Sequence, residues 1–398
     1  MPPVSEAGTL KMNRKQRRAQ GKAGQSPPAG TAVPDPAVLH EAGVEAYRAG
    51  DLDRAVALIA QAIKGNGGVP SFHYNLAIVL KAADRLEEAA TCYQHALALK
   101  PDYAEAHNNL GNVWKALGKK DDAMASFARA LAARPGYADA HYNLGVLFGE
   151  ANEKEKAEAH LQACLAQDPA DSRGVRMLLA HLGKAATPQR ASQAQMIQLY
   201  DQRSRSWDHE RSYHGHALVA RALRACASST ELDVLDAGCG TGLVGGLVRD
   251  IAGRLDGVDI SQPMLEKARA KRIYDALHQE DLVTFLSARK DDYDAITSAA
   301  TLIHFGDLRP VFEAAASGLR SGGLFVFTLF CGETDDAGFA PAASFDLARH
   351  GCYRHTSGYV GRLAGQTRFA VDGLEKAVHE HDLNGQPVAG LVAVLRRV

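Results

Sequence analysis

Two patterns of hydrophobic spacing divide the chain into two parts, and the first pattern repeats. From about residue 37 to residue 183, apolar residues recur at the spacing of amphipathic helices, and whole columns of residues recur every 34 positions. The columns hold Leu76, Leu110 and Leu144; Asn75, Asn109 and Asn143; Ala89, Ala123 and Ala157; and Pro101, Pro135 and Pro169. Small residues alternate with large ones where paired helices must pack closely, and a proline ends each unit. The pattern predicts an all-α repeat array.

This array resembles the tetratricopeptide repeat. A weaker copy begins near Ala37, so we expect about four repeats, followed by a capping helix from Ser172 to Leu182. The resemblance implies a groove that binds a peptide or protein, with the asparagine column holding the peptide backbone through paired amide bonds. The alternative is that these asparagines bond neighbouring turns within the array. A histidine column is too widely spaced to share a metal ion, so we expect a common packing position; it holds His73, His107 and His141.

After a linker at residues 184–192, short apolar runs alternate with helical patterns. The alternation predicts a mainly parallel sheet that ends in an antiparallel hairpin. Strands are expected near residues 232–236, 254–260, 274–277, 293–297, 324–330, 368–374 and 388–395. Helices are expected near residues 195–213, 214–226, 243–252, 262–271 and 308–319.

The first of these strands ends in a glycine turn. Asp236 stands at its carboxyl end, and Gly238, Gly240 and Gly242 let the backbone approach a ligand at the start of the next helix. Gly240, Gly242 and Gly245 also satisfy G-x-G-x-x-G, which leaves a dinucleotide formally open. A carboxylate at the strand tip would repel a pyrophosphate but would suit an ammonium group. The turn therefore favours an amino-acid-bearing nucleoside.

The residues Val-Leu-Asp236-Ala-Gly-Cys-Gly-Thr-Gly242 resemble motif I of the class I S-adenosylmethionine-dependent methyltransferases, and Gly-Val-Asp259-Ile-Ser resembles the second-strand motif. The resemblance implies a Rossmann-like domain with a seven-stranded, mostly parallel sheet, and S-adenosylmethionine as cofactor. The cofactor-binding residues that it implies are Asp236, Gly238, Gly240, Thr241, Gly242, Asp259, Ile260, Met264, Asp281, Leu282 and Tyr200.

Individual roles follow from the resemblance. Asp236 would lie near the amino group of the methionine moiety, and Asp259 would accept from both ribose hydroxyls, as a strand-end carboxylate can. Ile260 and Met264 would pack the adenine. Asp281 would accept from the adenine amine or, alternatively, cap the helix that begins at the next residue.

Substrate chemistry should lie beyond the ends of the fourth and fifth strands. His304 is the candidate general base, or else it caps or packs the following helix. Tyr200 and Trp207 are candidates for a lid that excludes water, or for ordinary interdomain packing. Trp207, Tyr213 and His355 are the candidate substrate-binding residues, with surface packing as the alternative for His355.

Composition narrows the class of protein. The chain has 398 residues, 46% of them hydrophobic, with a formal net charge of −1, which leaves no overall electrostatic footprint for nucleic acid. The six cysteines form no C-x-x-C, so neither a zinc site nor a disulfide framework is indicated. No apolar run approaches the roughly 18 residues of a membrane span. We therefore expect a cytoplasmic protein with no metal site and no membrane span.

Three regions result: a basic, disordered tail at residues 1–36, within which Met12 is an alternative start; the repeats at 37–183; and a methyltransferase domain with N-terminal lid helices at 184–398. The chain is similar to predicted bacterial methyltransferases that carry an N-terminal tetratricopeptide array. The sequence predicts a methyltransferase whose repeats recruit a protein or peptide-linked substrate. The alternatives are a small-molecule O- or N-methyltransferase with repeats used for assembly, and a non-catalytic scaffold. Nucleic acid is disfavoured because the fourth strand lacks an Asn-Pro-Pro-Tyr type of motif.

Overall fold

The computed structural model describes residues 34–398, apart from residues 210–211, 333–344, 349–350 and 383. The predicted tail at residues 1–36 therefore lies almost wholly outside the described residues. The chain forms two compact units, one ending at Gly118 and the other running from Lys119 to Val398. This division falls within the repeats, whereas the predicted domain boundary lies after residue 183.

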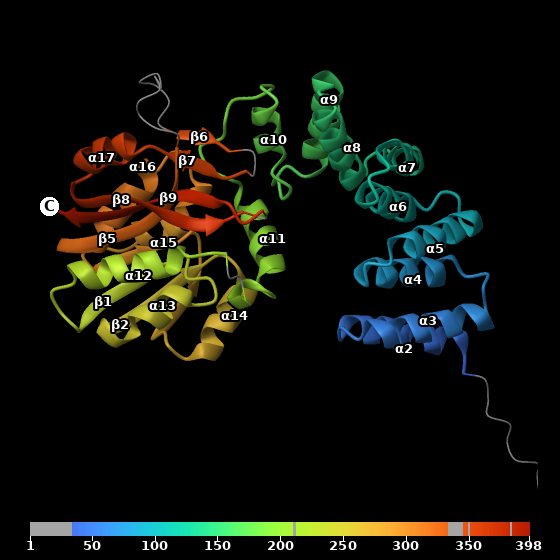
Figure 1. Cartoon of the computed structure of the whole chain (residues 1–398), viewed down its shortest axis with the longest axis horizontal. Helices are drawn as coiled ribbons and strands as arrows, with labels where there is room; N and C mark the ends of the chain where they lie inside the picture. The colour runs from blue at the N-terminus through green and yellow to red at the C-terminus, as the bar shows by residue number, and fades with distance from the viewer. Residues whose placement is uncertain (1–33, 210–211, 333–344, 349–350, 383) are drawn as a thin grey trace, which may run out of the picture. The chain divides into compact units, whose positions relative to one another are not determined.

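The first unit consists of paired antiparallel helices (Figure 1). Its described helices are α2 (Pro36–Arg48), α3 (Leu52–Gly65), α4 (Pro70–Ala82), α5 (Leu86–Leu99) and α6 (Ala104–Ala116). Gly43 on α2 lets the pair α2 and α3 approach closely, because a Cβ there would lie 2.5 Å from the Ile59 side chain. Ile59, Ala77 and Tyr93 are fully buried between the helices. Small residues facing large ones thus build the core, as the repeat pattern predicts.

The second unit begins with the remaining repeat helices. These are α7 (Lys120–Ala133), α8 (Ala138–Glu150) and α9 (Lys154–Gln167), followed by α10 (Val175–His181) at the place of the predicted capping helix. Across both units, the histidine column has one structural role. The Nε2 atoms of His73, His107 and His141 lie 3.0, 2.9 and 2.9 Å from the backbone carbonyl oxygen six residues earlier. Each histidine therefore fixes the turn that enters its own helix, which confirms the expectation of a shared packing position.

A nine-stranded sheet dominates the described part of the second unit. Its strands are β1 (Leu232–Ala237), β2 (Ala252–Asp259), β3 (Ala276–Gln279), β4 (Tyr293–Ser298), β5 (Leu319–Cys331), β6 (Phe345–Leu347), β7 (Tyr353–His355), β8 (Phe369–His381) and β9 (Pro387–Arg397). Strands β3, β2, β1, β4 and β5 are parallel neighbours in that order, and β9 and β8 continue the sheet antiparallel beyond β5. These are the seven predicted strands. The ribbon of β7 and β6, which pairs with the end of β5, was not predicted.

Helices cover both faces of this sheet (Figure 1). They are α11 (Gln193–Arg203), α12 (Gly215–Cys226), α13 (Leu243–Val248), α14 (Gln262–Lys271), α15 (Leu282–Ser287), α16 (Arg309–Gly318) and α17 (Ser357–Gln366), with short 3-10 turns at Trp207–His209, Arg249–Ile251 and Leu302–His304. Alternate residues of β1 serve the two faces: Val234 packs with α12 and α13, whereas Leu235 packs with α15, α16 and α17. Strand β1 is thus covered on both sides, as a parallel strand requires.

One predicted helix is wrong in extent. The segment expected to be helical from residue 195 to residue 213 leaves the helix after Arg203 and makes only a short turn at Trp207–His209. The Ser204 hydroxyl donates to the backbone carbonyl of Asp201 at 2.8 Å, a local bond that competes with helix continuation.

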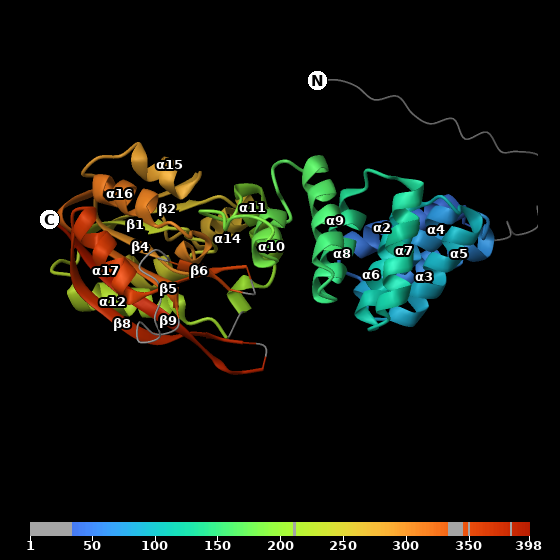
Figure 2. The same cartoon turned by 90° about the horizontal axis from the view of Figure 1, so that it is seen from above.

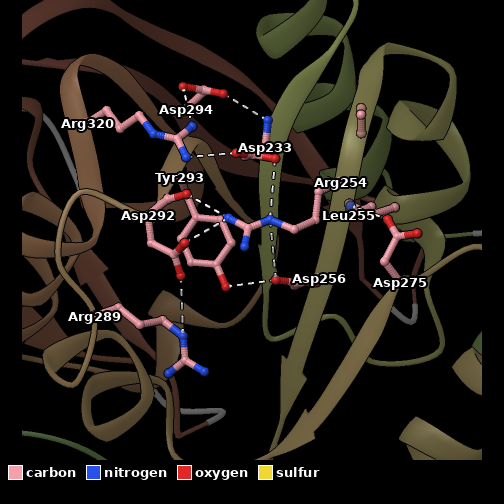
Figure 3. A network of polar contacts seen from close by, with 12 residues as sticks. Asp233, Arg254, Leu255, Asp256, Asp275, Arg289, Asp292, Tyr293, Asp294 and Arg320 are labelled. Atoms are coloured by element: carbon pink, nitrogen blue, oxygen red, sulfur yellow. Dashed lines mark hydrogen bonds and ion pairs between the residues drawn. The ribbon is translucent and has the colours of Figure 1, made fainter.

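An ion-pair network ties together the amino ends of three strands (Figure 3). Arg254 of β2 lies 3.3 Å from Asp233 of β1 and 2.9 Å from Asp292, which precedes β4. Its guanidinium also stacks on the ring of Tyr293, 4.9 Å from the centroid. The network fixes strand register at the edge opposite the glycine turn.

Candidate cofactor-binding site

The glycine turn follows β1 and has a backbone that only glycine adopts readily. Gly238, Gly240 and Gly242 have φ of +77°, +53° and +90°, in the left-handed region. A Cβ on Gly238 would lie 1.9 Å from the hydroxyl oxygen of Thr301, in the loop after β4. The turn therefore packs directly against that loop, and the two together form the floor of a cavity.

The cavity lies at the carboxyl ends of the parallel strands, where open α/β sheets bind their ligands. Nine predicted residues line it: Tyr200, Trp207, Tyr213, Gly238, Gly240, Asp259, Ile260, Met264 and Leu282. Sequence reasoning missed several wall residues, among them His216, Glu280 and the run Ala299, Ala300 and Thr301. Glu280 and the run from Ala299 to Thr301 lie next to predicted residues or strand ends, so their position beside those motifs could have indicated them. No feature of the sequence indicated His216.

Asp259 is the acidic group of the cavity that the glycine turn orients. Its two carboxylate oxygens accept from the backbone N–H groups of Gly240 at 2.9 Å and Ser261 at 2.8 Å. Burial raises the pKa of this carboxyl, and the backbone donors offset part of that rise. Each oxygen keeps acceptor capacity for a further donor, so the carboxylate suits a pair of vicinal hydroxyls.

Asp236 lies beneath the glycine turn rather than on the cavity wall. It does not line the cavity, and its carboxylate accepts instead from the Tyr274 hydroxyl at 2.6 Å and the Gly245 N–H at 3.0 Å. The residue is 1% exposed, and burial raises its pKa to about 6. Asp236 thus supports the turn from below, and its expected contact with a ligand ammonium stays a prediction.

Asp281 also turns away from the cavity. One carboxylate oxygen accepts from the N–H groups of Val283 and Thr284 at 3.1 and 3.3 Å, which caps α15. The other accepts from the Arg190 guanidinium at 2.7 Å. The helix cap, which was the alternative expectation, is therefore present. In this arrangement the Asp281 carboxylate does not face the cavity, so it is not placed to contact an adenine there.

His304 lies behind the cavity wall and does not line it. Its Nε2 shares a hydrogen bond of 2.7 Å with the hydroxyl of Tyr200, which does line the cavity. His304 therefore supports Tyr200 in this arrangement, and its expected role as a general base stays a prediction. Burial raises the pKa of Tyr200, so this hydroxyl stays protonated.

His355 is likewise a buried structural residue rather than a substrate wall. It is 0% exposed, and its Nε2 donates to the backbone carbonyl of Gly306 at 2.9 Å. Burial lowers its pKa to about 4, so the ring is neutral at physiological pH. The residue holds the loop after β4 against β7.

Two aspartates fasten α11 and the segment that follows it: Asp201 lies near the end of α11, and Asp208 lies in the 3-10 turn after it. Asp201 accepts from the Ser261 hydroxyl at 2.6 Å. Asp208 accepts from the Thr241 hydroxyl and pairs with Lys271 at 3.0 Å. Helix α11 accordingly lies beside α14 in both views (Figures 1 and 2). Thr241 is fully buried and acts through this latch rather than as a wall residue.

In the repeats, the asparagine column bonds to the preceding repeat. The amide nitrogen of Asn75 lies 2.8 Å from Nε2 of His40, and that of Asn109 donates to the Tyr74 hydroxyl at 3.0 Å. Asn143 is half-buried on α8. The bonds of Asn75 and Asn109 match the alternative of bonding within the array, whereas the peptide groove stays a prediction.

A metal-binding cluster and a membrane-spanning helix are both absent from the residues that the structure describes. In the ranges that the structure describes, no group of three or more His, Cys, Asp or Glu side chains is placed to hold a metal ion. No helix in those ranges is long and apolar enough to cross a membrane.

Comparison with known families gives three matches. Residues 234–323 match the family described as a methyltransferase domain, and residues 81–118 and 115–182 match TPR and tetratricopeptide repeat families. The first match covers β1, the glycine turn and the Asp259 motif. S-adenosylmethionine is the methyl donor of this domain family, which confirms the predicted cofactor.

Two curated relatives align with part of the chain. A malonyl-[acyl-carrier protein] O-methyltransferase of Acetivibrio thermocellus is 31% identical over 105 residues, 26% of this chain and 37% of the relative. A ubiquinone biosynthesis O-methyltransferase of Hydrogenovibrio crunogenus is 26% identical over 102 residues, 24% of this chain and 41% of the relative. The chain thus spans about two fifths of the length of the curated relatives that it matches.

A similar solved structure is an S-adenosylmethionine-dependent methyltransferase from Mesorhizobium loti, at 21% identity and a TM-score of 0.36, covering 44% of this chain and 96% of that one. The family matches and the observed architecture agree with the predicted fold class. The chain combines tetratricopeptide repeats with a methyltransferase domain.

Proposed function

We propose that the protein is an S-adenosylmethionine-dependent methyltransferase that binds its methyl donor in the cavity at the carboxyl edge of the sheet. The observation that carries this proposal is the coupling of Asp259 to the glycine turn. The Gly240 N–H holds one carboxylate oxygen at 2.9 Å, so the turn and the acid form one preorganised wall. The match of residues 234–323 to a methyltransferase domain supports the same assignment.

The residues on the wall fit the parts of this donor. Asp259 would accept from the ribose hydroxyls, and Ile260, Met264 and Leu282 would pack the adenine. Gly238 and Gly240, which both line the cavity, would lie under the methionine moiety. The Asp236 carboxylate would lie beneath the turn, near the amino group of the methionine moiety.

The donor supplies a methyl group on an activated sulfonium, so the chain has mainly to align the acceptor and exclude water. Tyr200, Trp207 and Tyr213 cover the cavity with aromatic surface: the Tyr200 and Trp207 ring centroids lie 5.8 Å apart, and those of Trp207 and Tyr213 lie 5.5 Å apart. His304 would hold the Tyr200 hydroxyl in place rather than remove a proton from the acceptor.

We propose further that the repeats recruit a protein or peptide-linked substrate, since repeat arrays of this kind present an extended concave surface. The repeat families matched at residues 81–182 support this role. A small-molecule acceptor, with repeats used for assembly, is the second candidate. This proposal also places the boundary between the repeats and the methyltransferase domain after residue 183.

Calorimetric titration with S-adenosylmethionine and S-adenosylhomocysteine tests the cofactor assignment. Asp259→Ala should weaken binding about 100-fold, because a charged acceptor of two hydrogen bonds is lost. Asp250→Ala is the matched control, since that carboxylate is exposed and pairs only with Arg224. Binding of NAD by the intact protein, or no binding of either S-adenosyl compound, would refute the proposal.

Transfer of labelled methyl groups in cell extract separates the two substrate classes. If the repeats recruit a protein, the label should enter acid-precipitable material in the presence of the full chain. If the acceptor is a small molecule, the label should appear in a soluble product that chromatography separates from the methyl donor. Cofactor binding without any labelled product would favour the non-catalytic scaffold.

A further inference from the structure

The segment predicted to be a linker is built into the methyltransferase domain. The backbone carbonyl of Gln189 accepts from the N–H groups of Gly306 at 2.7 Å and Asp307 at 3.0 Å. The N–H of Ala191 donates to the carbonyl of His304 at 2.9 Å. Residues 189–191 therefore add a short extended stretch to the loop that follows β4.

Arg190 lies at the centre of this stretch and makes two side-chain contacts. Its backbone forms an antiparallel bridge with Phe305, and its guanidinium lies over the Phe305 ring, 5.2 Å from the centroid. The same guanidinium donates to Asp281 at 2.7 Å. The Arg190 and Asp281 side chains are 39% and 16% exposed, so the ion pair is partly shielded from water.

The two residues joined by Arg190 adjoin segments that line the cavity, although neither residue lines it itself. Asp281 stands between Glu280 and Leu282, which line one wall, and the backbone N–H of Glu280 donates to the carbonyl of Asp259 at 3.1 Å. Phe305 lies in the loop whose first residues, Ala299 to Thr301, also line the cavity. The Arg190 side chain thus connects two segments that both contribute residues to the cavity.

We propose that Arg190 is a positioning residue for the cofactor site, which holds the turn before α15 and the loop after β4 at a fixed spacing. The inference rests on the proposed function, because it assigns the adenine to the wall that carries Leu282. It also explains why Asp281 faces away from the cavity: its two oxygens are occupied by the α15 cap and by Arg190. The linker is accordingly part of the site and not a tether.

The chemistry of the contact calls for arginine. A planar guanidinium can stack on an aromatic ring and donate to a carboxylate at the same time, whereas a lysine ammonium retains only the charge. Asp281 can be replaced by asparagine without loss of the helix cap, since asparagine is an equally good N-cap residue. Arg190→Gln and Asp281→Asn therefore remove the ion pair from its two ends.

The test is calorimetric titration of the full chain with S-adenosylhomocysteine. Arg190→Gln and Asp281→Asn should each weaken binding roughly three- to tenfold, as loss of a partly shielded ion pair would. The double variant should be no weaker than either single variant, because both remove the same contact. Arg190→Lys should recover part of the affinity, and added salt should weaken the wild type more than Arg190→Gln. Lys290→Met, on an exposed lysine, is the control.

Several results would overturn the inference. Equal or tighter binding by Arg190→Gln would mean that the ion pair does nothing for the site, or that it withholds Asp281 from the adenine. Additive losses in the double variant would mean that Asp281 contacts the ligand itself. A lowered unfolding midpoint with unchanged affinity would mean a structural role alone. No binding of S-adenosylhomocysteine by the wild type would instead refute the proposed function.

Discussion

At the residue scale, the main lesson concerns carboxylates at the ends of parallel strands. Asp236 and Asp259 lie at the carboxyl ends of neighbouring strands; Asp236 is buried, whereas Asp259 is half-buried. Asp259 accepts only from backbone N–H groups and faces the cavity. Asp236 accepts from the Tyr274 hydroxyl, which takes its carboxylate out of the cavity. The partner supplied from elsewhere in the fold therefore decides which of two similar acids can bind a ligand.

The buried acid of the turn should give the protein a pH-dependent stability. Burial raises the pKa of Asp236 from an ordinary 3.8 to about 6, so the folded state holds this proton more tightly than the unfolded state. The stability that the carboxyl contributes is then fully present below pH 3.8 and is lost as the pH rises through 6. Asp236→Asn does not titrate, so its free energy of unfolding relative to the wild type should improve by roughly 2 kcal/mol between pH 4 and pH 7. Urea unfolding at both values measures this, and a difference independent of pH would contradict it.

Sequence reasoning placed some site residues well and others poorly, for a physical reason. Gly240 and Asp259 contact each other across adjacent strands and are only 19 residues apart, and each lies in a strand-end motif, so local motifs are sufficient to locate them. Asp281, His304 and His355 have partners 91, 104 and 49 residues away. No local pattern encodes such contacts, and each of these side chains turns from the predicted ligand toward its distant partner.

At the scale of the element, helix α14 shows what a capping residue contributes to prediction. It begins where expected because Ser261 caps it, with Pro263 in the first turn. Strands β6 and β7 are only three residues each and owe their conformation to pairing with β5 and with each other. Such short strands carry no periodicity, so they could not be predicted.

The segment between α11 and α12 can be tested most directly. It carries Trp207 and is fastened to the glycine turn and α14 through Asp208, whose bonds to Thr241 and Lys271 lower its pKa although burial acts to raise it. Asp208→Asn keeps an acceptor for Thr241 and loses the ion pair. Release of S-adenosylhomocysteine should become about threefold faster at low salt, and the difference should shrink at high salt. Stopped-flow displacement measures the rate.

Asp372→Asn provides the control for this rate measurement, because Asp372 pairs with Arg396 between β8 and β9, where neither residue lines the cavity. Its release rate should equal that of the wild type. Equal rates for Asp208→Asn and the wild type at every salt concentration would show that the latch does not limit release.

At the scale of the whole molecule, the chain forms two compact units, of which only the second contains the cavity. A repeat array is stabilised mainly by contacts between adjacent helices, so damage within the first unit should stay within the array. A ligand of the second unit stabilises only what it binds. Stability and cofactor affinity should therefore be separable by mutation.

Ile59 offers the clearest test of this separation, since it is fully buried and packs on Gly43 in the first repeat. Ile59→Ala should lower the stability of the array by about 3 kcal/mol through the cavity that it leaves, and Ile59→Val by about 1 kcal/mol. In scanning calorimetry, the variants should lower one transition, and S-adenosylhomocysteine should raise a different one. Its affinity should be unchanged in both variants. If the mutation and the ligand instead shift a single common transition, the two units unfold together, and occupancy of the repeats could then reach the cofactor site through the stability of the fold.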